Sequence, residues 1–150
     1  MDIQRKAEGL LDQAKEILKR DGSHAPIVIV YGQRENSAVL LEPPTPDAKY
    51  GAMYVLGLVH SPLGPQAVAF ICEAWMSTQT PPEGVSVGEM PDRQEALCVA
   101  VQTRRLSGYS IVLPFVKVGE EVVFGEPVQG SDVDMHLFEY FWRGVLDGEG

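Results

Sequence analysis

The stretch Ala67–Ser77 reads Ala-Val-Ala-Phe-Ile-Cys-Glu-Ala-Trp-Met-Ser and decides how this chain folds. Successive side chains of an extended strand point to opposite faces of a sheet, and both sets are apolar here, as in a buried strand. Glu73 is the one interruption. Because an apolar environment disfavours an ionised carboxylate, Glu73 is the leading candidate for a functional residue.

Two interpretations of Glu73 stay open. In the first, apolar neighbours raise its pKa, and it acts as a general acid or base. In the second, it forms a structural ion pair with Arg93, Arg104 or Arg105. Arg93 belongs to the charged segment Pro91-Asp92-Arg93-Gln94-Glu95. If Glu73 and Arg93 face each other on neighbouring strands, they fasten the ends of the long loop before Arg93, as a clamp or as the rim of a pocket.

The remaining sequence predicts one α+β domain over residues 1–150, in which three helices cover a mainly antiparallel sheet of five to six strands. Helical periodicity covers 2–20, and a Thr45 cap followed by Pro46 starts a helix that runs to about residue 60. Ser131 and the acids at 132 and 134 start a last helix. The predicted strands are 27–31, 37–41, the stretch that contains Glu73, 94–102, 109–118 and 121–124, with a turn at Ser107-Gly108.

The middle helix has apolar residues around almost its whole circumference. It must therefore be buried on more than one side, either between the sheet and another helix or against the same helix of a second copy. Gly51 and Gly57 permit close approach in both arrangements. Internal burial is the first expectation, and a homodimer is the alternative.

The composition excludes several classes of partner. The net charge is −9, and residues 119–150 carry eight acids against the single base Arg143, so nucleic acid and membrane surfaces are not expected partners. There is no signal peptide and no membrane-spanning run, which predicts a cytoplasmic protein.

The chain lacks Gly-rich phosphate-binding motifs, and its last-helix acids and His136 fit a solvated face, so neither a cofactor nor a metal is expected. Cys72 and Cys98 fit buried thiols, and a bridge between them requires adjacent strands in a suitable register.

These observations favour a non-catalytic binding or interaction domain that pairs with itself, with another protein or with a small ligand. Asp92, Trp75, Tyr140 and Trp142 are the predicted contact residues, because aromatic side chains at a surface commonly anchor partners. Tyr140 and Trp142 border the apolar stripe of the last helix and are expected to be partly exposed. The alternative is a small enzyme in which Glu73 is the acid or base, Arg93 orients an anionic substrate and residues 78–92 act as a lid.

Overall fold

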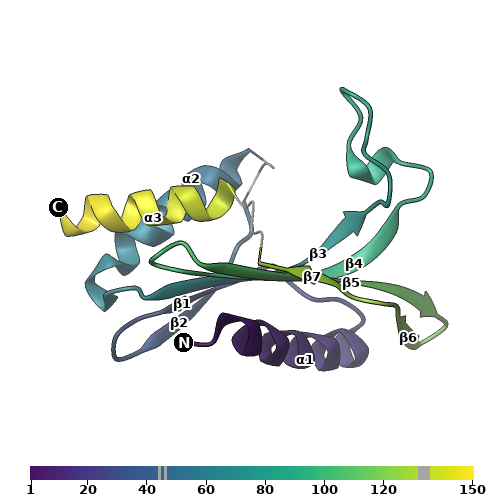
Figure 1. Cartoon of the computed structure of the whole chain (residues 1–150), viewed down its shortest axis with the longest axis horizontal. Helices are drawn as coiled ribbons and strands as arrows, with labels where there is room; N and C mark the ends of the chain where they lie inside the picture. Colours follow the sequence, from purple (N-terminus) through teal and green to yellow (C-terminus); the bar gives the residue numbers. More distant parts are fainter. Residues whose placement is uncertain (44, 46, 132–135) are drawn as a thin grey trace.

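A computed structural model describes residues 1–43, 45, 47–131 and 136–150 of the chain and shows an α+β fold (Figure 1). The helices are α1 (Ile3–Asp21), α2 (Ala48–His60) and α3 (His136–Glu149), with short 3-10 helices at Ser61–Leu63 and Val87–Glu89. The strands are β1 (Ile27–Tyr31), β2 (Asn36–Leu40), β3 (Ala67–Met76), β4 (Gln94–Thr103), β5 (Gly108–Val118), β6 (Glu121–Phe124) and β7 (Val128–Gly130). None of the helices in these ranges is long and apolar enough to cross a membrane.

The strands form one antiparallel sheet in the order β2-β1-β3-β4-β5-β6, and β7 pairs with β5 beside β6. β3 lies inside the sheet, where Ile71 is paired with Ile27 on one side and with Val99 on the other. Its first five residues are buried. The apolar run that contains Glu73 therefore forms an interior strand, as the sequence predicts.

Helices cover both faces of the sheet, which makes three layers (Figure 1). α1 packs on one face against alternate residues of β3, β4 and β5, and Ala69, Val99 and Ile111 belong to this core. α2 and α3 pack on the other face against the intervening residues, including Val68 and Phe70. The double covering explains why β3 lacks the alternation of apolar and polar residues that a one-sided sheet shows.

The ends of α1 and α2 follow from local hydrogen bonds. The Asp2 side chain accepts from the Arg5 N–H at 3.1 Å and caps α1, and Gly22, at φ 76°, ends the helix by donating its N–H to the Leu18 carbonyl. α2 starts later than predicted, at Ala48 with Asp47 as its N-cap residue, and Thr45 Oγ1 accepts a hydrogen bond from the Ala48 N–H at 3.3 Å. Pro46 lies outside the described residues.

α2 and α3 touch backbone to backbone through glycines. A Cβ atom added at Gly57 would collide with the Phe141 carbonyl oxygen and would lie 2.9 Å from the Val145 nitrogen. A Cβ at Gly144 of α3 would collide with the Tyr54 carbonyl of α2 in the same way. The expected internal burial of the middle helix is thus observed on one side, against α3 and the sheet, and Gly57 is a residue that permits it.

Two details of the sheet differ from the prediction. The β4–β5 turn lies at residues 104–106 instead of Ser107-Gly108, because Gly108 is paired with Gln102 and already belongs to β5. Leu106 completes this turn with a left-handed φ of 70°. The short strand β7 was not predicted.

The predicted cap and first turn of α3, at Ser131 to Asp134, involve residues 132–134, which lie outside the described residues.

Candidate functional site

Glu73 is half-buried on the face of β3 that α1 covers, directly opposite Leu97. Its Oε2 accepts a hydrogen bond from the backbone N–H of His24 at 3.3 Å. His24 is 4% exposed, and its Nδ1 lies 2.7 Å from the Ala25 carbonyl oxygen, so this nitrogen is the donor. Glu73 thus holds the connection between α1 and β1 against the sheet.

The predicted ion pair between Glu73 and Arg93 is wrong. The β3–β4 register places Glu73 opposite Leu97 and ends with Met76 opposite Gln94, so Arg93 lies beyond the strand pair. The Arg93 guanidinium stacks over the Trp75 ring, with Cζ 5.4 Å from the ring centroid. Among the described residues, Arg104 is bound to Glu149 instead of Glu73.

Asp92 fastens the two ends of the long loop between β3 and β4. Its Oδ1 accepts from the Ser77 hydroxyl at 2.6 Å, and its Oδ2 accepts from the Thr78 hydroxyl at 2.7 Å and from the Thr78 N–H at 3.1 Å. The hydrogen bonds from Ser77 and then Thr78 lower the pKa of Asp92. The clamp predicted for Glu73 and Arg93 is therefore made by Asp92, a residue that the sequence assigned to partner contact.

The loop that Asp92 closes rises away from the three layers instead of folding over a cavity (Figure 1, upper right). Trp75 stands at its base, 49% exposed, between Arg93 and Gly88, whose added Cβ would lie 3.1 Å from the Trp75 ring. Met90 is 5% exposed and anchors the loop. The loop is thus a projecting arm with its own small packing, and this placement gives no support to a lid over Glu73.

The two aromatic residues predicted on α3 have different surroundings. Tyr140 is half-buried, with its ring 5.2 Å from the Tyr50 ring of α2. Trp142 is only 7% exposed, and its Nε1–H donates to the Gln102 side chain at 2.9 Å. The expectation of a partly exposed anchor is wrong for Trp142, because α3 turns this side chain onto the sheet.

The solvent-facing side of α2 is apolar. Gly51, Val55, Leu58 and Val59 are exposed and share one side of the helix by their spacing, and Val55 and Val59 are 52% and 64% exposed. We call these four residues the α2 face. A Cβ added at Gly51 would meet no atom within 4 Å, so packing inside the chain does not require glycine there.

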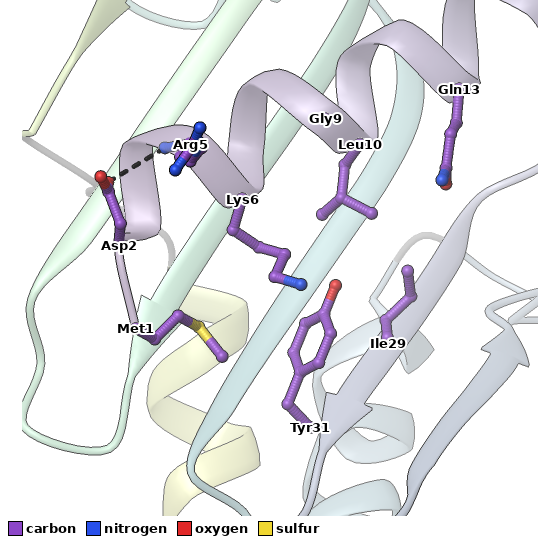
Figure 2. A pocket seen from close by; sticks show the side chains of 9 residues that line it. All are labelled: Met1, Asp2, Arg5, Lys6, Gly9, Leu10, Gln13, Ile29 and Tyr31. Carbon is purple, nitrogen blue, oxygen red and sulfur yellow. Dashed lines mark hydrogen bonds between the residues drawn. The ribbon is translucent and has the colours of Figure 1, made fainter.

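A hollow of about 500 Å³ lies between α1 and β1 (Figure 2). Leu10 and Ile29 supply apolar walls, and the Lys6 amine lies over the Tyr31 ring, 5.0 Å from its centroid. Burial raises the pKa of Tyr31. Gly9 also lines the hollow, and a Cβ added there would meet no atom within 4 Å. We call this hollow the α1 groove.

The sequence interpretation missed the α1 groove, because residues of β1 and α1 form it together. The available signal was Gly9, an exposed glycine in the interior of α1 that costs about 1 kcal/mol relative to alanine. Within the described parts of the chain, no group of three or more His, Cys, Asp or Glu side chains is placed to hold a metal.

Comparison with known proteins places the chain in a family. A family model described as "Bacteriophage lambda protein ea47" matches residues 1–139. No curated protein and no solved structure matches the chain. The matched range includes the whole sheet, α1, α2 and the first residues of α3. The chain therefore belongs to the bacteriophage lambda protein ea47 family.

Proposed function

We propose that this protein is a non-catalytic interaction domain that forms a homodimer through the α2 face. The observation that carries the proposal is a helix whose solvent-facing side is apolar. α2 contains no Asp or Glu, and its two basic residues, Lys49 and His60, lie outside the α2 face. A solvated helix normally turns charged and polar residues outward, so a covering partner accounts for this pattern.

A second copy of the chain is the partner that fits best. In a two-fold symmetric dimer the same patch is used by both subunits, so any charge near the axis faces its own copy. With a net charge of −9, most of the surface of this protein repels a second copy. The α2 face carries no such charge, and Gly51 allows a second helix to approach closely.

The test replaces Val59 of the α2 face with lysine and measures the molar mass by light scattering. The proposal expects a dimer for the parent chain and a monomer for Val59→Lys. The matched control is Val118→Lys, which changes a valine of similar exposure, 60%, at the end of β5 and should leave the dimer intact. A parent chain that is monomeric, or a dimer that survives Val59→Lys, would contradict the proposal.

The α1 groove supports a second candidate function, the binding of a small anionic ligand with an apolar body. Its size falls within the range of about 300–1,000 Å³ that is usual for ligand sites. Lys6 and Arg5 supply positive charge, and neither has a carboxylate partner among the described residues. Gly9 keeps the α1 backbone open to a bound group.

An anilinonaphthalene sulfonate dye is a suitable probe for the α1 groove, because it joins an aromatic body to an anionic group. Binding should increase dye fluorescence, and Lys6→Gln and Gly9→Leu should each weaken it. Lys117→Gln is the control, because Lys117 lies on β5 outside the groove. Equal dye binding by the parent and both groove variants would exclude the groove as the binding site.

The enzyme alternative, with Glu73 as acid or base and Arg93 orienting a substrate, receives less support. Glu73 accepts a hydrogen bond from the backbone N–H of His24. Arg93 lies beyond the end of the β3–β4 pair and stacks on Trp75, so the two residues do not face a common substrate position. Its test compares Glu73→Gln with the parent in an activity screen. A loss of turnover in a folded variant would restore the enzyme hypothesis over the interaction domain.

A further inference from the structure

Both cysteines of the chain lie directly opposite each other in the sheet. Cys72 of β3 is paired with Cys98 of β4, both are half-buried, and both are free thiols. Directly opposed residues point to the same face of an antiparallel sheet. Here it is the face covered by α2 and α3, where Cys72 packs against the core that contains Phe70 and Ala100. The structure thus supplies the adjacent strands and the register that a bridge requires.

Sheet geometry sets the distance between the two Cα atoms. The Thr103 N–H donates to Ser107 toward β5, and the Arg104 N–H donates to Gln66 toward β3. Because backbone groups alternate along a regular strand, the backbone groups of Cys98 point toward β3. Cys72 and Cys98 are therefore a hydrogen-bonded pair with Cα atoms about 5.5 Å apart, which lies within the range for disulfides.

The two thiols also differ in acidity. A hydrogen bond between the side chains raises the pKa of Cys72, where burial acts in the same direction, and lowers the pKa of Cys98. A thiolate at Cys98 is stabilised by the neighbouring Cys72 thiol, which accounts for the opposite directions. Cys98 is therefore the sulfur that becomes a thiolate first and reacts first with a disulfide.

We propose that Cys72 and Cys98 form a reversible intramolecular disulfide by exchange with low-molecular-weight disulfides. The Cys98 thiolate attacks one sulfur of the reagent disulfide and releases the first thiolate. Cys72 then loses its proton, its sulfur attacks Cys98 in the mixed disulfide, and the second thiolate leaves. The protein loses two protons and two electrons, and the reagent disulfide takes them up and is reduced to two thiols.

The bond would join β3 and β4 at the base of the projecting arm. It closes a loop that includes the Asp92 clamp and Trp75. The Cβ atoms of a hydrogen-bonded cross-strand pair are farther apart than those of a non-hydrogen-bonded pair, so a disulfide between Cys72 and Cys98 requires a local adjustment of β3 and β4. Strain of this kind makes a disulfide easier to reduce, which suits a reversible link rather than a permanent one.

The experiment equilibrates the reduced full-length chain with mixtures of reduced and oxidised glutathione, and follows free thiols and intact mass. Both thiols should disappear together, and the mass should fall by two hydrogens with no retained glutathione. Cys72→Ser removes the second attack, so this variant should keep one glutathione on Cys98. Circular dichroism of each variant checks that it is folded.

Three results would overturn the proposal. The parent chain could retain glutathione as a stable adduct, could form a covalent dimer on a non-reducing gel, or could keep both thiols at every glutathione ratio. Each of these results is measured on the parent chain, so the outcome does not depend on how well a variant folds.

Discussion

Gly57→Ala tests the close contact between α2 and α3. Its new methyl group would collide with the Phe141 carbonyl and would lie 2.9 Å from the Val145 nitrogen, and both obstacles are backbone atoms of a helix that cannot rotate away. The helices must therefore separate. Overpacking of this kind lowers the free energy of unfolding by up to about 3 kcal/mol, and the better helix propensity of alanine offsets about 1 kcal/mol of this loss. We expect a net loss of about 2 kcal/mol, which lowers Tm by about 4–8 °C.

Urea unfolding followed by circular dichroism measures this loss at one fixed protein concentration, because dimer formation would make stability depend on concentration. Gly9→Ala is the matched control, since open space surrounds Gly9 and alanine should there stabilise α1 by about 0.5–1 kcal/mol. Gly144→Ala enters the same contact from α3, so the double variant with Gly57→Ala should lose less than the sum of the two. A Gly57→Ala chain as stable as Gly9→Ala would refute the backbone contact.

Three further predictions concern the arm, the β4–β5 turn and Glu73. In an NMR titration the pKa of the Asp92 carboxyl should lie below its ordinary value, and Ser77→Ala should raise it; an unshifted pKa would contradict the clamp. Because the pKa of Asp92 is lowered in the folded chain, its stabilising effect is present above the unfolded pKa and is lost as pH falls through the folded pKa. Leu106→Gly should raise the free energy of unfolding by about 0.5–1 kcal/mol, because glycine removes the cost of a left-handed leucine at φ 70°, and a loss of stability in thermal unfolding would count against this. Glu73→Ala should cost about 1 kcal/mol, the value of one hydrogen bond to the His24 N–H, whereas a loss of about 3–5 kcal/mol in urea unfolding would indicate a buried ion pair instead.

The sequence predicted α1 because its apolar residues follow a helical period, and it predicted β3 because the run is apolar on both faces of an extended chain. It predicted α2 from the start signals Thr45 and Pro46. β7 escaped prediction because three residues are too few to show a period, and Val128 to Gly130 pair only because the edge of β5 is available beside β6. The β4–β5 turn was misplaced because Ser107-Gly108 has turn composition. The pairing of Gln102 with Gly108 instead forces the turn onto less typical residues, including Leu106.

The candidate site was harder to predict than the fold, because it depends on register and side-chain direction. The sequence identified the charged segment around Arg93 but not that Asp92 would bind Ser77 and Thr78. Similarly, the sequence shows that Trp142 borders the apolar stripe of α3, but it does not show that the indole N–H donates a hydrogen bond to Gln102 of β4. The opposition of Cys72 and Cys98 follows from a register that spacing along the chain does not contain.

Sedimentation equilibrium of the unmodified chain over a wide range of concentrations tests the proposed self-association most directly. The α2 face predicts a mass that rises with concentration to twice the 16.4 kDa of one chain. A mass of one chain at every concentration would contradict it.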